Sequence, residues 1–316
     1  MTRCKILINT ELHPDALRFL EEEDFEAVVV SQVDPKASAD AVGECVGMVS
    51  NAVLPIDDAF FQKGTNLKVV GRQGVGYDNV DVEAATRRGV RVVNTPLPII
   101  EPVAEHTFLL MLAVARRLIP GHLALPRGEW RGPKTAPQPE LKGRRLGLVG
   151  LGNTGRRVAE IATRGFGMEV SYFDRVARPE AEEALGLTRR SLPELLAESD
   201  FVSVHVNLYP ETHHLLDAKA FSIMKRGCIF INVSRGPVVD EEALAAALRS
   251  GHLGGAGIDV FEVEPPGKDN PLWSLPNVVV TPHVAGWSLE SKRGTSMVVE
   301  DIVKVLKGEK PKHPVN

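Results

Sequence analysis

Residues 145–174, RLGLVGLGNTGRRVAEIATRGFGMEVSYFD, contain the strongest indication of the fold. An apolar segment is followed by three glycines, Gly150, Gly152 and Gly155, and then by a helical pattern. A second apolar segment ends at Asp174. A strand, a glycine turn, a helix and a second strand in this order predict a βαβ unit, whose two strands lie parallel in one sheet.

The three glycines have different physical tasks. Gly150 permits a tight turn, Gly152 lets the backbone approach a pyrophosphate, and Gly155 lets the helix lie close to the strand. The N-terminus of that helix presents unpaired N–H groups and the positive end of its dipole to phosphates. We therefore predict a dinucleotide site formed by Gly150, Gly152, Asn153, Thr154 and Gly155.

Asp174 identifies the kind of dinucleotide. It lies 19 residues beyond Gly155, where a carboxylate can accept hydrogen bonds from both hydroxyls of a ribose. A carboxylate repels the 2′-phosphate of NADP, so the sequence favours NAD as the cofactor. Arg175 and Arg178 follow directly and could bind such a phosphate, which keeps NADP as the alternative.

Two series of alternating strand and helix patterns predict two α/β domains with parallel sheets, one over 1–95 and one from 145 to about 284. A last helical pattern at 289–308 follows the final strand of the second series, so we expect it to pack on the first domain. The prediction is a doubly wound Rossmann NAD-binding domain at 99–286. It is inserted into a discontinuous, flavodoxin-like substrate domain at 1–98 plus 287–316.

Composition limits the classes of partner. The chain of 316 residues has a formal net charge of -4, which gives no reason to expect nucleic acid or an anionic membrane as a partner. Its most apolar stretch, 108–115, is far shorter than a membrane span, and we expect a cytoplasmic protein. Cys4, Cys45 and Cys228 are predicted to be reduced thiols. No histidine lies near them in a metal-ligand spacing, so no metal is expected.

Three later segments share one form, an apolar strand followed by polar residues. They are CIFINVSRGPVVDEEAL with Arg235, GAGIDVFEVEPP with Asp259 and Glu264, and VVVTPHVAGWS with His283. The ends of parallel strands lie side by side at one edge of a sheet, where ligands bind in open α/β folds. Taken singly, Arg235 could cap a helix, Glu264 could be a solvated acid and His283 could be a scaffold residue. Together, beside a dinucleotide motif, they predict a catalytic site.

These residue types suit the interconversion of a 2-keto acid and a 2-hydroxy acid. Arg235 can bind the carboxylate and polarise the ketone oxygen through its fork of donors. Hydride from NADH leaves negative charge on that oxygen, and His283 can supply the proton because imidazole titrates near neutral pH. Glu264 would favour the charged imidazolium and orient it. In the reverse direction His283 acts as the base. The remaining histidines considered, His106, His213, His214 and His252, are expected to be surface or packing residues.

The same segments resemble the D-2-hydroxyacid dehydrogenase family, and the likeness covers most of the chain. The matching motifs are GRQGVGYDNVDVEAATRRGVRVVNTP (71–96), VAEHTFLLMLAVARR (103–117), GLVGLGNTG (147–155), INVSRGPVVDEEAL (231–244), DVFEVEPP (259–266) and TPHVAGWS (281–288). The resemblance implies a two-domain enzyme with its site in the cleft between the domains. It also implies a homodimer built partly on the helix at 101–118, and a substrate such as glyoxylate, hydroxypyruvate or a larger analogue.

The resemblance further implies roles for single residues. Arg235, Glu264 and His283 would be the catalytic set. The cofactor would be bound by the glycine motif and Asp174 together with His205, Val206, Val233, Ser234, Asp259 and Gly286, with Asp259 near the nicotinamide amide. The substrate would be bound by Asn51, Val75, Gly76, Arg235 and His283, with Val75 and Gly76 acting through backbone N–H groups.

Two alternatives remain open. Phosphoglycerate dehydrogenases are the most similar branch over 71–96, but their substrate loop carries an arginine for the phosphate where this chain has Asn51. We expect this chain to be a short form of that branch, without the regulatory domain of its longer members. Formate dehydrogenases are similar too, but they pair the catalytic histidine with glutamine, so Glu264 argues against them.

The second alternative is an NAD-sensing corepressor of the same fold, which would need a groove for a partner peptide.

Overall fold

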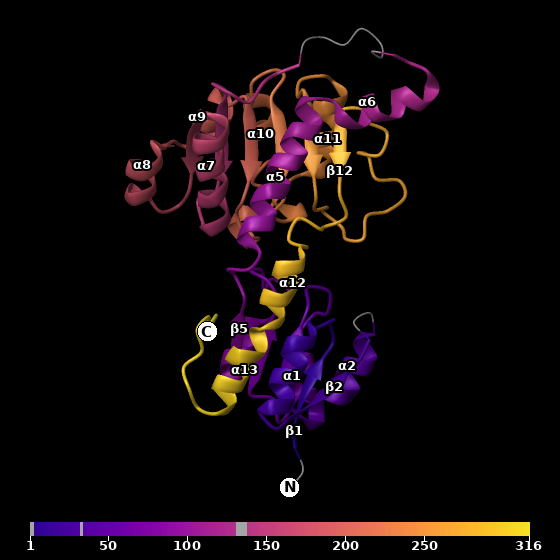
Figure 1. The fold of residues 1–316 in the computed structure, drawn as a ribbon, viewed down its shortest axis with the longest axis vertical. Helices are drawn as coiled ribbons and strands as arrows, with labels where there is room; N and C mark the ends of the chain where they lie inside the picture. The colour runs from indigo at the N-terminus through magenta and orange to yellow at the C-terminus, as the bar shows by residue number, and fades with distance from the viewer. Residues whose placement is uncertain (1–2, 32–33, 131–137) are drawn as a thin grey trace. The chain divides into compact units, whose positions relative to one another are not determined.

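The computed structural model describes residues 3–31, 34–130 and 138–316. The chain divides into two compact units, one made of Met1–Ile99 and Trp287–Asn316 and the other of Ile100–Gly286. Each unit is built around one sheet of parallel strands, which confirms the predicted fold class (Figure 1).

The first unit has a five-stranded sheet in the order β2-β1-β3-β4-β5, and each pair of neighbouring strands is parallel. Its strands are β1 (Cys4–Ile8), β2 (Phe25–Val29), β3 (Cys45–Ser50), β4 (Val69–Arg72) and β5 (Arg91–Asn94). Its helices are α1 (Pro14–Glu22), α2 (Pro35–Ala41), η1 (Val42–Glu44), α3 (Asp58–Lys63), α4 (Val82–Arg87), α12 (Leu289–Ser296) and α13 (Val298–Leu306).

Helices cover both faces of this sheet, so its central strands are apolar on both faces. Leu7 and Met48 pack in one buried cluster, while their neighbours Ile6 and Val49 pack in another on the opposite face. The second cluster contains Val298, Val299, Ile302 and Val303 of α13. The C-terminal residues therefore supply part of the core of the N-terminal unit.

The C-terminal tail forms two helices, where the pattern over 289–308 predicted one. The break lies at Met297, which ends α12 and precedes α13. The hydroxyls of Thr295 and Ser296 donate to the carbonyls of Ser291 and Lys292, one turn earlier. These side-chain bonds compete with the backbone ladder in the last turn of α12, directly before the break.

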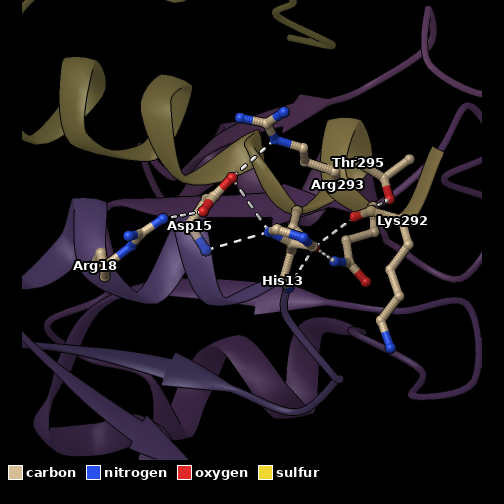
Figure 2. A network of polar contacts seen from close by, with 8 residues as sticks. His13, Asp15, Arg18, Lys292, Arg293 and Thr295 are labelled. Carbon is tan, nitrogen blue, oxygen red and sulfur yellow. Dashed lines mark hydrogen bonds and ion pairs between the residues drawn. The ribbon is translucent and has the colours of Figure 1, made fainter. Parts of the chain in front are cut away.

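A polar network joins α12 to the start of α1. Figure 2 shows Asp15 between Arg18 and Arg293, and the Arg293 guanidinium lies 2.8 Å from the Asp15 carboxylate. His13, the residue that caps α1, donates its backbone N–H to Ser296 Oγ over 2.9 Å. These contacts hold the first helix of the tail against the first helix of the chain.

The second unit has a seven-stranded sheet in the order β12-β11-β10-β9-β6-β7-β8, again parallel at every pair. Its strands are β6 (Arg145–Val149), β7 (Glu169–Phe173), β8 (Thr188–Arg189), β9 (Phe201–Val204), β10 (Ile229–Asn232), β11 (Gly255–Ile258) and β12 (Val278–Val280). Its helices are α5 (Ile100–Ala115), α6 (Leu118–Ala124), η2 (Leu125–Arg127), α7 (Asn153–Phe166), α8 (Pro179–Leu185), α9 (Leu192–Glu198), η3 (Pro210–Thr212), α10 (Ala218–Ile223), η4 (Gly236–Val238) and α11 (Glu241–Arg249).

The long helix α5 lies across β10, β11 and β12 on one face of this sheet (Figure 1). It is buried along much of its length, including Val103, Ala104, Thr107 and Phe108. No single helix in the described ranges is long and apolar enough to span a membrane. Only α5 taken together with 118–127 reaches that length and composition, as a pair bent by 57°.

Candidate active site

The glycine motif forms a close-packed turn between β6 and α7. Gly150 has φ +100, and a Cβ there would lie 2.8 Å from the carbonyl oxygen of His205. A Cβ at Gly155 would lie 2.3 Å from the carbonyl oxygen of Gly150, so helix and turn approach too closely for any side chain. Gly152 precedes α7, and a Cβ there would meet no described atom within 4 Å. The turn is thus closely packed at Gly150 and Gly155 and open at Gly152, next to the N-terminus of α7. This open position leaves space for a dinucleotide phosphate.

Asp174 follows β7 and faces this turn. Its Oδ2 accepts the N–H of Leu151 over 2.8 Å, and its Oδ1 accepts the N–H of Val176 over 3.0 Å. Arg175 lies over the ring of Tyr209, with its guanidinium carbon 5.5 Å from the ring centroid. The structure therefore places a carboxylate beside the glycine turn and stacks the neighbouring arginine on an aromatic ring.

His205 is the first residue after β9, and its carbonyl packs against the glycine turn at Gly150. Its Nε2 lies 2.9 Å from Ser203 Oγ. Burial lowers the pKa of His205 to about 4. The imidazole is therefore neutral at physiological pH and adds no positive charge at the predicted cofactor site.

His283 and Glu264 form the closest pair of predicted catalytic residues. Nδ1–H of His283 donates to Oε2 of Glu264 over 2.7 Å, and Oε1 of Glu264 accepts the N–H of Phe261 over 3.0 Å. Burial by itself would raise the pKa of Glu264, but the hydrogen bond and charge of His283 outweigh it and lower the pKa. Glu264 is thus an ionised partner for the imidazole at neutral pH.

Arg235 is positioned by the turn that follows β10. Asn232 holds this turn by donating from Nδ2 to the carbonyl of Arg235 and by accepting the N–H of Ser234 at Oδ1. The Arg235 charge also lowers the pKa of Glu264, although less than His283 does. The guanidinium therefore lies within electrostatic range of the pair that His283 forms with Glu264.

The next residue, Gly236, lies where the segments that carry two of the predicted catalytic residues, Arg235 and Glu264, touch. A Cβ at Gly236 would lie 1.8 Å from the carbonyl oxygen of Phe261 and 2.5 Å from the backbone nitrogen of Glu262. The backbone after Arg235 is therefore in direct contact with the backbone before Glu264. Only glycine permits this approach.

Asp259 is buried and organises the segment that carries His283. Its carboxylate accepts the hydroxyl of Thr281 at 2.6 Å and the backbone N–H groups of Val284 and Ala285 at 2.9 Å each. Its carbonyl accepts the N–H of His283 over 2.8 Å. The structure thus surrounds the Asp259 side chain with protein donors.

The remaining predicted cofactor residues also belong to the second unit. Val206 follows β9, and its side chain would lie 2.9 Å from a Cβ at Gly150. Val233 and Ser234 follow β10, and Gly286 is the last residue of the unit. These positions agree with a site at the carboxyl ends of the strands.

The predicted substrate residues Asn51, Val75 and Gly76 lie in the first unit. The side-chain amide of Asn51 has hydrogen-bond partners within this unit. Its Oδ1 accepts the N–H of Val53 over 2.8 Å, and its Nδ2 donates to the carbonyl of Asn9. The carbonyl of Val75 accepts from Asn94 Nδ2 over 2.8 Å. Within the described ranges, the N–H groups of Val75 and Gly76 have no protein acceptor.

His106 was expected to be a surface or packing residue, and the structure packs it against Thr281, beside the segment that carries His283. Its Nε2 lies 2.9 Å from Thr281 Oγ1, and its side chain is only 13% exposed. The two residues are 175 positions apart. No local pattern connects them, although a histidine at the start of the largely apolar run HTFLLMLAVA was a signal of a buried polar contact.

Comparison with known proteins adds independent observations. Residues 108–285 match the family described as D-isomer specific 2-hydroxyacid dehydrogenase, NAD binding domain. The glyoxylate reductase of Korarchaeum cryptofilum is 40% identical over 322 residues, covering 99% of this chain and 96% of that protein. The D-3-phosphoglycerate dehydrogenase of Methanocaldococcus jannaschii is 39% identical over 314 residues, covering 99% of this chain and 59% of that protein.

A solved structure agrees with these matches. The NADPH-dependent glyoxylate/hydroxypyruvate reductase of Sinorhizobium meliloti, in complex with NADP and malonate, has a TM-score of 0.88 to this chain at 33% identity. The comparison covers 99% of this chain and 97% of that one. Sequence identity over the whole length and the shared two-sheet fold lead to the same conclusion: the chain belongs to the D-isomer specific 2-hydroxyacid dehydrogenase family, whose members are oxidoreductases acting on CH–OH donors.

Proposed function

We propose that this protein reduces a small 2-keto acid, of the size of glyoxylate or hydroxypyruvate, with NADH, and catalyses the reverse oxidation of the D-2-hydroxy acid. The observation that carries the proposal is the 2.7 Å hydrogen bond between His283 and an ionised Glu264. An imidazole paired in this way can deliver a proton to an alkoxide as it forms. The names of the relatives from Korarchaeum cryptofilum and Sinorhizobium meliloti support the substrate class.

Each residue has a defined task in the proposed reaction. Bound NADH supplies the hydride. Nδ1 of His283 is engaged by Glu264, so Nε2 is the atom that gives the proton to the substrate oxygen. Arg235 binds the substrate carboxylate and polarises the ketone.

NAD is the proposed cofactor in preference to NADP. The Asp174 carboxylate beside the glycine turn accepts ribose hydroxyls and repels a 2′-phosphate. Arg175, which could bind such a phosphate, is stacked on Tyr209. Arg189 donates to the backbone carbonyls of Asp174 and Arg175. The Sinorhizobium relative is NADPH-dependent, so the preference has to be measured for this chain.

Phosphoglycerate is the alternative substrate, because one relative is named D-3-phosphoglycerate dehydrogenase. Asn51 argues against it. A neutral amide that already accepts from Val53 and donates to Asn9 is a poor match for a doubly charged phosphate.

We also propose a cytoplasmic homodimer. Large apolar side chains are exposed along and after α5, at Leu109, Leu118, Ile119, Leu123, Leu125 and Trp130. A second copy covering this face would remove them from water. Cys4, Cys45 and Cys228 are free thiols, which suits a reducing compartment. Light scattering of the purified chain tests the dimer directly, and a monomer at micromolar concentration contradicts it.

A panel of 2-keto acids of graded size, assayed with NADH and NADPH, tests the reaction. We expect oxidation of NADH with glyoxylate or hydroxypyruvate, weaker use of NADPH, and no oxidation of NADH with 3-phosphohydroxypyruvate. A blank across the whole panel, combined with tight binding of NADH, would instead support the NAD-sensing corepressor.

A further inference from the structure

We propose that His106 is a positioning residue for the reaction. It acts through Thr281 and Asp259 on the segment that carries His283. The inference rests on the proposed function in one respect only, the assignment of His283 as the acid and base. His106 itself has no predicted contact with substrate or cofactor.

The three side chains form a continuous chain of hydrogen bonds. His106, in the second turn of α5, has its Nε2 atom 2.9 Å from Oγ1 of Thr281, which follows β12. Thr281 Oγ1 lies 2.6 Å from Oδ1 of Asp259, which follows β11. The His106 Nε2 atom is 3.6 Å from that same carboxylate oxygen, too far for a direct hydrogen bond. The hydroxyl is therefore the link.

The direction of each bond follows from the chemistry of the groups. A carboxylate can only accept, so the single hydroxyl hydrogen of Thr281 points to Asp259. Thr281 must then accept from His106, which places a hydrogen on Nε2 of His106. Burial lowers the pKa of His106 and outweighs the opposing charge of Asp259, so the ring is neutral with its hydrogen on Nε2 alone. One tautomer of His106 thus sets the orientation of the Thr281 hydroxyl.

Asp259 transmits this arrangement to His283. Its carboxylate accepts the N–H groups of Val284 and Ala285, the two residues after His283. Its carbonyl accepts the N–H of His283 itself. His283 has φ +53, in a region that L-residues seldom adopt and keep only where the surroundings hold them there. A polar chain that begins at His106 therefore ends on the backbone of His283 and of the two residues that follow it.

Substitutions of His106 and Thr281, the two partners of the first hydrogen bond, distinguish a positioning role from a packing role. His106→Gln keeps a donor at about the distance of Nε2, whereas His106→Leu fills the space without one. Thr281→Ser keeps the hydroxyl and Thr281→Val removes it. His252→Leu is the matched control, because His252 lies after α11 and its Nε2 atom is buried without a partner among the described residues.

The kinetic result expected is a loss of turnover. We expect kcat of His106→Leu to fall about 10-fold or more, because misplacing a reacting group by about 1 Å can cost on the order of 100-fold. The Kd of NADH and the KM of the keto acid should stay within about threefold. His106→Gln should recover most of kcat, and the losses from His106→Leu and Thr281→Val should not add in the double variant. Loss of NADH affinity with unchanged kcat would overturn the proposal.

Nitrogen NMR of the full chain labelled with ¹⁵N-histidine gives a readout that needs no turnover. We expect the His106 ring to be neutral with its hydrogen on Nε2. The ring signals of His283 should move in His106→Leu but stay in His106→Gln and His252→Leu. The proposal would be overturned if the His283 signals were unchanged in His106→Leu, or if the ring hydrogen of His106 were on Nδ1. If these signals behave as expected while no keto acid is reduced, the proposed function fails and the positioning chain stands.

Discussion

The imidazole of His283 and the carboxylate of Glu264 meet over 2.7 Å, and the other oxygen of Glu264 accepts the N–H of Phe261 over 3.0 Å. The carboxylate is thus held by the backbone of its own segment while it orients a ring from another. One nitrogen of the ring is engaged, so the other is the atom available to a substrate.

Replacing Glu264 by glutamine should lower turnover. The side-chain oxygen of glutamine can still accept from Nδ1–H of His283, but a hydrogen bond to a neutral amide holds the ring less strongly than one to a carboxylate. We expect kcat for keto-acid reduction, measured as NADH oxidation, to fall about 10-fold or more. Glu262→Gln, two residues earlier and paired with His214, is the control and should keep the wild-type kcat. A wild-type kcat in Glu264→Gln would remove the assigned role.

Asp174→Ala should weaken NADH binding and reduce the preference for NADH over NADPH. Hydrogen bonds to a charged group contribute about 1.5–3 kcal/mol, so the KM of NADH should rise roughly 10-fold or more. Loss of the negative charge should also lower the KM of NADPH, because a 2′-phosphate is no longer repelled. The KM of the keto acid serves as an internal control, and a variant with an unchanged ratio of the two cofactors would contradict the placement of the ribose.

Gly236→Ala should destabilise the protein and abolish turnover. The new Cβ would lie 1.8 Å from the Phe261 carbonyl oxygen, a backbone atom that has to move to make room. Overpacking of this kind costs about 1–3 kcal/mol or more in the free energy of unfolding. Gly267→Ala is the matched control, because a Cβ there meets no described atom within 4 Å. Urea unfolding of both variants, with NADH oxidation, measures the difference; equal stabilities would show that the contact is not rigid.

His205 should make stability depend on pH between about 4 and 6.5. Burial lowers its pKa in the folded protein to about 4 from an ordinary value of 6.5. In this range the unfolded chain binds a proton that the folded chain does not, so the free energy of unfolding falls as pH falls. We compare the free energy of unfolding in urea at pH 7 with that at pH 4.5. In His205→Asn the difference between the two values should be smaller than in the wild type by up to about 3 kcal/mol. The exposed His122→Asn should leave the dependence intact, and equal slopes for His205→Asn and wild type would contradict the prediction.

Much of the architecture was predictable because it depends on neighbours in the sequence. Apolar runs that end at Gly150, Asp174 and Asn232 became parallel strands, and the glycine spacing became the turn before α7. The tail was predicted less well. Its helical pattern gave no sign that the helix would break at Met297, where α12 ends and α13 begins.

The classes of local structure, the dinucleotide motif and the polar residues at the ends of the strands could all be found from the amino-acid order alone. Periodicity and glycine spacing act over a few residues, so a linear pattern can carry them. The contact of Gly236 with Phe261, and that of His106 with Thr281, 175 positions away, exist only once the chain has folded. Hydrogen bonds and steric contacts act over about 3 Å, and the folding of α5 onto the sheet brings such distant residues within that range.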